Sequence, residues 1–388
     1  MWKGKVINMN IKVLASTKMG YKMTKEEAMD FSGKSAGICY LPDTIDVLFA
    51  ENSEKTEKRA KGTLLSGHHS VFSHVTYNLI LEDVPKILAM ILNNEKVYNT
   101  SEKSARYTKM KPSEKEKGLY EKWLEIYKNQ ILNKYPNMDE KKAVKLAQEN
   151  ARNLISVFTP ATTMEYTVSF GQLNYIIHWF EDFIENAEDT EFNKRLKNVF
   201  SEFNKNIESL NVPELNSRLK KREISFFAKR QRKEEFGENY CINYTGTFAQ
   251  LAQAQRHRTV SYEMSFLEKN EFTVPLIIKD TEYEKEWLVD IKSLENEFPQ
   301  GMLIQINERG TIENFVMKCQ ERLCGAAQLE IAYQTRDNLM RYVDAVKDDE
   351  VLYNYLLPYT KGARCTFPGW RCTSPCIWGA KNAFNRLV

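Results

Sequence analysis

The chain has 388 residues, of which 42% are apolar and 28% are charged, and its formal net charge is +3. This composition is typical of soluble globular proteins, and the length allows two average domains or one large one. The small net charge does not indicate a nucleic-acid partner, and no apolar run approaches the roughly 18 residues of a membrane span. We therefore expect a protein that binds neither nucleic acid nor membrane.

The N-terminal residues and the cysteines favour a cytoplasmic protein. Residues 1–5 lead into a short strand-like stretch and not into a signal-peptide core. Seven cysteines without a disulfide-scaffold pattern are typical of a reducing compartment. Three of them, Cys365, Cys372 and Cys376, cluster in the tail, but a structural zinc site needs a fourth ligand, which the tail lacks. We expect no bound metal.

The first part of the chain predicts strands and helices by its apolar periodicity. The predicted strands lie at 5–16 and 75–81, and the predicted helices at 25–31, 52–65 and 84–92. The first of these helices has a clear start signal, because Thr24 and Glu27 have the spacing of a capping box. The segments therefore alternate between the two structure types.

The middle of the chain is helical and then apolar. Residues 113–157 are rich in Lys and Glu, and apolar residues recur in them at helical spacing, which predicts helices with one solvated face. These apolar residues are Leu119, Trp123, Ile126, Tyr127 and Leu132. The apolar and aromatic residues of 160–183 are expected in the core. Residues 211–213, Asn-Val-Pro, mark the best domain boundary.

One polar stretch, 253–265, has the composition of a functional site. Arg256, His257 and Arg258 are adjacent, and Ser261, Glu263 and Ser265 follow them. Two guanidiniums beside an imidazole repel one another, so burying them without an anionic partner is costly. Arginine is suited to bidentate recognition of phosphates and carbonyl-rich rings. The alternative interpretation is a solvated basic turn.

Arg-His-Arg followed by Ser-x-Glu-x-Ser resembles the signature of the flavin-dependent thymidylate synthases, the ThyX family. In that family seven residues separate the Arg-His-Arg from the last serine, whereas six separate Arg258 from Ser265 here. The resemblance implies an α+β fold in which an antiparallel sheet is flanked by helices.

The second half of the chain resembles the first. Residues 72–79, a helix, and Asn-Glu-Lys at 94–96 correspond to residues 236–244, a helix, and Arg-His-Arg at 256–258. We therefore interpret the chain as two ThyX-like repeats, 1–212 and 213–388, paired as a pseudo-dimer.

The resemblance assigns nucleotide and flavin contacts to the first repeat. Ser70 matches a flavin-contacting position, and Glu102, Ser104 and Arg106 match the nucleotide-binding Glu-x-Ser-x-Arg segment. The Arg-His-Arg position of this repeat reads Asn-Glu-Lys at 94–96. Arg152 is the nearest candidate for another phosphate-binding arginine of the family.

The second repeat keeps the complementary set. Gln253 and Arg256 match nucleotide contacts, and the Arg-His-Arg of 256–258 matches flavin contacts. Arg322, with Gln328 and Glu330, matches the family's Arg-x5-Gln-x-Glu-Ile segment. The Glu-x-Ser of this repeat is followed by Phe-Leu-Glu-Lys, so it lacks a counterpart of Arg106. The family's flavin-contacting Asn-x-Arg segment is matched in neither repeat.

Because the family builds each site between subunits, the resemblance implies one composite site per chain. It implies reductive methylation of dUMP to dTMP, with methylenetetrahydrofolate and NADPH as co-substrates and FAD as hydride carrier. Ser104 and Arg106 would bind the phosphate, and Arg322 would stabilise charge on the pyrimidine. The alternatives are another uridine nucleotide as substrate, or a silent flavin- or nucleotide-binding protein. A homodimer forming a pseudo-tetramer is expected.

Overall fold

The computed structural model describes residues 10–16, 22–38, 47–48, 50–103, 110–215 and 223–388. The chain forms two compact units, which we call unit 1 (Met1–Lys111 and Phe158–Ile224) and unit 2 (Pro112–Val157 and Ser225–Val388). The units are interleaved in the sequence, whereas the two predicted repeats are consecutive. The division into repeats at 212/213 therefore stays a prediction from sequence correspondence. Ser104 and Arg106 lie outside the described residues.

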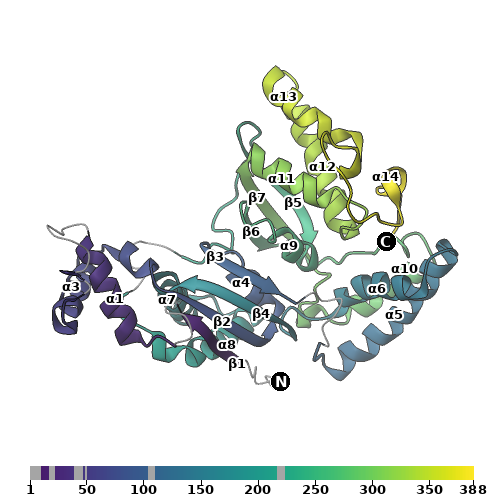
Figure 1. Ribbon diagram of the computed structural model, residues 1–388. Coiled ribbons are helices and arrows are strands. Elements are labelled where there is room, and N and C mark those ends of the chain that lie inside the picture. Colours follow the sequence, from purple (N-terminus) through teal and green to yellow (C-terminus); the bar gives the residue numbers. More distant parts are fainter. Residues whose placement is uncertain (1–9, 17–21, 39–46, 49, 104–109, 216–222) are drawn as a thin grey trace. The chain divides into compact units, whose positions relative to one another are not determined.

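Unit 1 contains a four-stranded antiparallel sheet in the order β1-β2-β4-β3 (Figure 1). The strands are β1 (Asn10–Ser16), β2 (Thr76–Pro85), β3 (Tyr98–Glu102) and β4 (Pro160–Ser169). The helices are α1 (Lys25–Gly37), α3 (Ser53–Leu65), α4 (Lys86–Leu92), α7 (Phe170–Asn186) and α8 (Glu191–Asn206), with short 3-10 turns η2 (His69–Ser73) and η4 (Glu208–Leu210). These elements match the described parts of the strands and helices predicted before residue 93, except that Val84 and Pro85, predicted as helix, belong to strand β2.

Helix α1 begins as the sequence predicts. The Thr24 hydroxyl accepts from the Glu27 backbone N–H, and the Glu27 carboxylate accepts from the Thr24 N–H, so the capping box is confirmed. Helix α1 crosses α3 closely at Gly33, where an added Cβ would lie 2.1 Å from the Thr56 carbonyl oxygen. Only glycine fits this approach of two backbones.

The core of unit 1 lies between the sheet and the α7–α8 pair. Phe180 and Phe200 stack with ring centroids 3.7 Å apart, and Phe203 packs edge-on against Phe180. Strand β4 and the first turns of α7 are mostly buried. The segment 160–183 is therefore core, as expected, although its periodicity did not reveal the change from strand to helix at Phe170.

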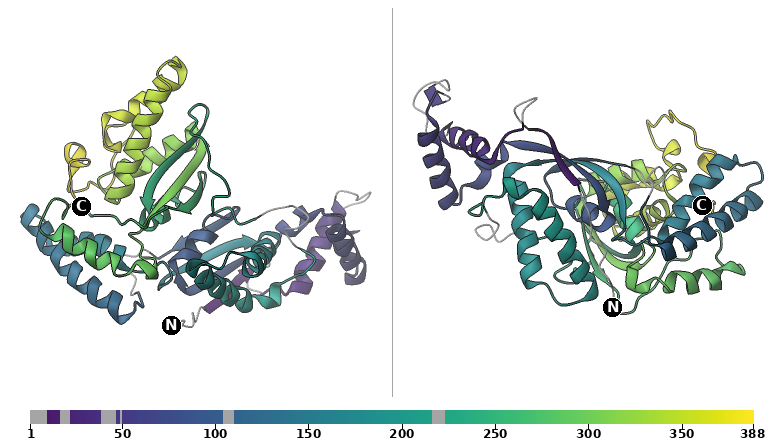
Figure 2. Two further views of the ribbon diagram at one scale, coloured as in Figure 1. Left: turned by 180° about the vertical axis from the view of Figure 1, so that it is seen from behind. Right: turned by 90° about the horizontal axis from the view of Figure 1, so that it is seen from below.

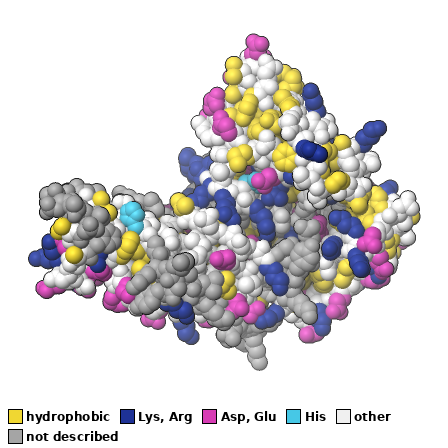
Figure 3. Space-filling view, viewed as in Figure 1, with side chains coloured by type: hydrophobic (Ala, Val, Ile, Leu, Met, Phe, Trp, Pro, Cys, Tyr) yellow, Lys and Arg dark blue, Asp and Glu magenta, His cyan; other side chains and the backbone are white. Residues whose placement is uncertain are grey.

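Unit 2 contains a three-stranded antiparallel sheet in the order β5-β7-β6 (Figures 1 and 2). The strands are β5 (Asn239–Thr247), β6 (Ser261–Phe266) and β7 (Leu303–Thr311). The α-helices are α5 (Glu114–Lys134), α6 (Glu140–Ala151), α9 (Phe248–Ala254), α10 (Tyr283–Lys292), α11 (Ile312–Arg322), α12 (Leu329–Ala345), α13 (Glu350–Leu356) and α14 (Gly379–Asn382). The 3-10 turns are η3 (Arg152–Leu154), η6 (Glu295–Glu297), η7 (Leu357–Lys361) and η8 (Arg364–Thr366). Figure 3 shows apolar side chains, in yellow, over the α11–α13 part of this unit.

Helices α5 and α6 bury the face that the sequence predicts. Trp123 and Tyr127 are fully buried, and both pack edge-on against Trp287 of α10, with ring centroids 4.9 and 5.5 Å away. Leu119, Ile126 and Leu132 pack at the margin of this cluster. Burying large aromatic rings contributes strongly to stability, so this cluster holds 112–157 in unit 2.

The two units share one order of elements. Unit 1 runs β2, α4, β3 and later β4, α7, while unit 2 runs β5, α9, β6 and later β7, α11. The sheet orders β2-β4-β3 and β5-β7-β6 correspond, and α4 and α9 each have seven residues. Antiparallel sheets flanked by helices confirm the expected α+β class. No described helix is both long and apolar enough to cross a membrane.

Candidate functional site

The Arg-His-Arg residues occupy the turn between α9 and β6 in unit 2. Helix α9 ends at Ala254, whose carbonyl accepts from the His257 N–H at 2.9 Å. Arg256 and Arg258 are exposed, whereas His257 is only 6% exposed. Gln253 lies half-buried in the last turn of α9. The turn therefore presents two guanidiniums to solvent and directs the imidazole inward.

The buried imidazole bonds to the arginine predicted to be catalytic. Arg322 is the last residue of α11, and its Nε donates to His257 Nε2 at 2.6 Å. Since Nε2 accepts, the imidazole proton is on Nδ1, which lies 3.7 Å from the Glu321 carboxylate. Burial lowers the pKa of His257 to about 2, and the charges of Arg322 and Lys318 add to the effect. His257 is therefore neutral, and the positive charge of the turn is on Arg256 and Arg258.

Arg322 is held so that only one edge of its guanidinium is used. Its Nε is bonded to His257, while Nη2 lies 3.9 Å from the Glu321 carboxylate. Burial lowers the pKa of Arg322, the charge of Glu321 opposes this shift, and the smaller effects of Arg256 and Arg364 act in the same direction as burial. A guanidinium whose terminal nitrogens have only this one long ion pair, among other cations, is suited to an anionic or electron-rich ligand.

The rest of the Arg-x5-Gln-x-Glu segment contacts the 112–157 part of unit 2. Gln328 precedes α12, and its side-chain oxygen accepts from Arg152 Nη2 at 2.8 Å. The Thr247 hydroxyl donates to Glu330 at 3.3 Å. Burial raises the pKa of Glu330, and the charge of Arg152 opposes this shift. Residues from both predicted repeats, Arg152 and Gln328, therefore meet within one compact unit.

A buried ion pair beneath the site was not predicted. Lys318, one turn before Arg322 in α11, lies 2.5 Å from the Glu308 carboxylate, and neither side chain is more than 1% exposed. Tyr240 and Tyr244 donate to the same carboxylate at 3.0 and 2.9 Å. The available signal was weak: a lysine on the buried face of α11 next to Cys319. The pair fixes α11 to β7 and so supports Arg322.

The two Glu-x-Ser segments differ in register. Glu102 pairs with Met164, six residues before Phe170 at the start of α7. Glu263 pairs with Asn307, five residues before Ile312 at the start of α11. Because side chains alternate along a strand, one residue of shift puts the two glutamates on opposite sheet faces. The position equivalent to Glu102 is Met264 and not Glu263, which accounts for a gap one residue shorter than the family's.

The contacts of the two glutamates agree with this difference. Glu102 accepts from Lys86 of α4 at 2.6 Å and from Asn93, which follows α4, at 3.4 Å. Glu263 is bound on both carboxylate oxygens by Arg232, at 2.9 and 2.7 Å, and also by Arg309. Burial raises the pKa of Glu263, but these arginines outweigh it and lower the pKa overall. Glu263 therefore has a structural role in an ion-pair cluster with Arg232 and Arg309.

The remaining predicted site residues are in unit 1. Ser70 is exposed in η2. Its neighbour His69 is buried, donating from Nε2 to the Leu64 carbonyl at 3.2 Å and accepting on Nδ1 from the Tyr175 hydroxyl at 2.8 Å. His69 thus has a structural role. Unit 2 brings together Gln253, Arg256–Arg258 and Arg322, and the joining of these residues to the Glu102–Arg106 segment stays a prediction.

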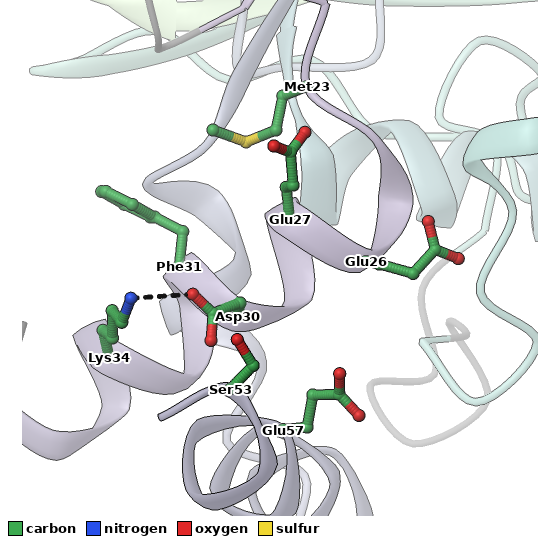
Figure 4. Close-up of a pocket in the computed structure, with 8 residues that line it drawn as sticks. All are labelled: Met23, Glu26, Glu27, Asp30, Phe31, Lys34, Ser53 and Glu57. Carbon is green, nitrogen blue, oxygen red and sulfur yellow. Dashed lines mark ion pairs between the residues drawn. The ribbon is translucent and has the colours of Figure 1, made fainter. Parts of the chain in front are cut away.

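A pocket of about 410 Å³ lies between α1 and α3 (Figure 4). Its charged lining residues are Glu26, Glu27, Asp30, Lys34 and Glu57. The single lysine is paired with Asp30 at 2.9 Å, so the net field in this pocket is negative. It is unsuited to a phosphate, and we do not take it as the site. Within the described residues, no group of His, Cys, Asp and Glu could hold a metal ion.

Comparison with known proteins places the chain. The family Thy1, described as thymidylate synthase complementing protein, matches residues 22–208. Among solved structures, the UMP/dUMP methylase PolB from Streptomyces cacaoi is 13% identical to this chain, with a TM-score of 0.34. The alignment covers 54% of this chain and 93% of PolB. ThyX from Helicobacter pylori, solved with FAD and dUMP, is 14% identical to this chain, with a TM-score of 0.33. The alignment covers 53% of this chain and 99% of that ThyX chain. No curated protein matches. Through residues 22–208, the chain belongs to the Thy1 family.

Proposed function

We propose that the protein is a flavin-dependent thymidylate synthase, which methylates dUMP reductively to dTMP at one composite site per chain. Methylenetetrahydrofolate would supply the carbon and NADPH the reducing equivalents. Membership of the Thy1 family and the repeated order of elements in the two units support this proposal. The nucleotide would be held by Glu102, Ser104 and Arg106 of one repeat and by Gln253, Arg256 and Arg322 of the other.

The observation that carries the composite site is the hydrogen bond from Arg152 to Gln328. Arg152 precedes residue 212 and is the candidate phosphate-binding arginine of the first predicted repeat. Gln328 belongs to the Arg-x5-Gln segment of the second, and the two side chains meet at 2.8 Å. A site built from both repeats requires such a convergence, which two independent sites would not need.

The cation set of unit 2 fits the flavin that the family implies. Arg256 and Arg258 are exposed guanidiniums on one turn, suited to the diphosphate or the electron-rich ring of FAD. When bound, FAD would carry the hydride. Arg322 would stabilise the negative charge that develops on the pyrimidine, and neutral His257 would orient it through Nε.

The register difference at β6 favours a single active site. Met264 occupies the place that Glu102 has in unit 1, and Glu263 is held by two arginines on the other sheet face. The second pseudo-site therefore lacks its carboxylate and its Arg106 counterpart. We expect one nucleotide per chain, and a homodimer forming a pseudo-tetramer, which a monomeric mass in light scattering would contradict.

The test is tritium release from dUMP labelled at C5, with FAD, NADPH and methylenetetrahydrofolate. Wild type is compared with Arg106→Ala, Arg322→Ala and, as a control on an exposed arginine, Arg371→Ala. Loss of release in the first two variants alone supports the composite site. Release that survives Arg106→Ala means that the second repeat works alone. Release from UMP in place of dUMP indicates the other uridine substrate, and bound flavin without turnover indicates a silent binder.

A further inference from the structure

The C-terminal tail is attached at the catalytic end of α11. The Arg364 backbone N–H donates to the carbonyl of Leu323 at 2.6 Å, and Leu323 directly follows Arg322. Further along, Arg386 Nη2 donates to the Ala327 carbonyl at 2.6 Å. The tail therefore folds back along the loop that joins Arg322 to Gln328.

This attachment brings an unassigned guanidinium to the site. The Arg364 side chain lies over the Trp370 ring, with its central carbon 4.8 Å from the ring centroid. Its Nε is buried and has no hydrogen-bond partner among the described residues. Its Nη1 reaches the Gln320 carbonyl only at 3.5 Å. The ring thus fixes the plane of the guanidinium while one edge stays unused.

Arg364 belongs to a group of cations around Arg322 that one carboxylate, that of Glu321, partly offsets. Arg256 and Arg364 are both near enough to Arg322 for their charges to lower its pKa, although burial has the largest effect and the charge of Glu321 opposes them. The carboxylate that approaches Arg322 is Glu321, at 3.9 Å, and in the described part of the chain neither Arg256 nor Arg364 makes an ion pair. Three guanidiniums beside one carboxylate leave an excess of positive charge, and a bound anion would relieve the repulsion among them.

We infer that the tail supplies Arg364 as a second guanidinium, with Arg256, of a phosphate site that lies beside Arg322. The ligand is a phosphate ester, which offers several oxygens to bidentate N–H donors. The inference deepens the proposed function and rests on it, because the ester would be the phosphate of dUMP or the diphosphate of FAD. The competing explanation is structural: a cation near the C-terminus of α11 interacts favourably with the helix dipole.

The test compares ligands with and without phosphate by calorimetry. Wild type, Arg364→Gln, Arg364→Lys and the exposed-tail control Arg371→Gln are titrated with dUMP against deoxyuridine, and with FAD against riboflavin. Losing a charge-assisted contact should weaken the phosphate-bearing ligand roughly tenfold to hundredfold in Arg364→Gln. The phosphate-free ligand should be unaffected, Arg364→Lys should retain part of the affinity, and Arg371→Gln should match wild type.

If only dUMP binds more weakly, the phosphate belongs to the nucleotide, and if only FAD binds more weakly, it belongs to the flavin. Equal weakening of both members of a pair would mean that Arg364 is only structural, and unchanged affinity for dUMP and FAD would also overturn the inference. Titration with inorganic pyrophosphate distinguishes failure of the Arg364 inference from failure of the proposed function. If wild type binds neither dUMP nor FAD but binds pyrophosphate, and Arg364→Gln does not, the anion site stands. If wild type binds none of the three, both are refuted.

Discussion

A neutral, buried His257 makes the stability of the protein depend on pH in a defined direction. The pKa of His257 falls from its ordinary 6.5 to about 2 on folding. Below pH 6.5 the unfolded chain binds a proton at this residue and the folded chain does not, so acid favours unfolding. The stabilisation is complete above pH 6.5 and is lost as the pH falls. One pH unit corresponds to about 1.4 kcal/mol, so lowering the pH from 6.5 to 4.5 should cost about 2.5 kcal/mol at this residue.

The variant His257→Gln isolates this contribution. Glutamine offers an amide oxygen that can accept from Arg322 in place of Nε2, but it does not titrate. Urea unfolding of both proteins is measured at pH 7.5, 6.5, 5.5 and 4.5, and all other titrating groups cancel in the difference. The free energy of unfolding of wild type should fall relative to the variant by about 1 kcal/mol between pH 6.5 and 5.5 and by about 1.4 kcal/mol between pH 5.5 and 4.5.

The outcome that refutes this reasoning is a difference between the two proteins that stays constant with pH. Nitrogen-15 NMR of labelled histidines gives an independent test of the tautomer. The resonance missing from His257→Gln should show a proton on Nδ1 and none on Nε2 down to pH 4.5. A midpoint near 6.5 for that resonance would mean that burial and the charges of Arg322 and Lys318 do not hold the imidazole neutral.

Three further predictions test the packing and the register. Gly33→Ala should destabilise the protein by about 1–3 kcal/mol because its Cβ would meet the Thr56 carbonyl. Gly62→Ala should stabilise it, because Gly62 lies in α3 with open space around the added Cβ. Thermal melts of both variants test this, and equal shifts in melting temperature would contradict the close crossing of α1 and α3. Lys318→Met should lower the free energy of unfolding in urea by about 3–5 kcal/mol, because it leaves the Glu308 carboxylate buried without its cation. The double variant Lys318→Met/Glu308→Leu should recover part of the lost stability. If it recovers none, the ion pair does not have this role. Glu263→Gln should lower stability by about 1–3 kcal/mol and leave dUMP affinity unchanged, and a loss of nucleotide affinity in calorimetry would contradict its place on the opposite sheet face.

Local signals in the sequence predicted the elements well. The capping box at Thr24 and the helical spacing of Trp123 and Tyr127 depend on contacts within a few residues or on one buried face, and both are present. The segment 160–183 was recognised as core but not divided, because β4 is followed by α7 without a turn residue that would mark the change. Periodicity alone cannot separate a buried strand from a buried helix.

Long-range pairings were the part that the sequence could not supply. The motifs group Arg256, His257 and Arg322, which lie together in unit 2, but the hydrogen bond between His257 and Arg322 joins residues 65 apart in the chain. Lys318 and Glu308 are ordinary charged residues until both are buried together. The opposite faces of Glu102 and Glu263 follow from strand register, which a gap of six residues in place of seven indicates only when the pairing is known.

The interleaving of the two units has a consequence for biosynthesis. Helices α5 and α6 emerge from the ribosome long before Trp287 of α10, which fills the space beside Trp123 and Tyr127. Until then, these two large aromatic side chains have no partner from α10, and a nascent chain exposes apolar surface that chaperones recognise. Unit 1 likewise receives β4, α7 and α8 only after the 112–157 segment has been made. The chain passes from one unit to the other three times, so neither unit can be separated by one proteolytic cut or expressed alone from a gene truncated at one point.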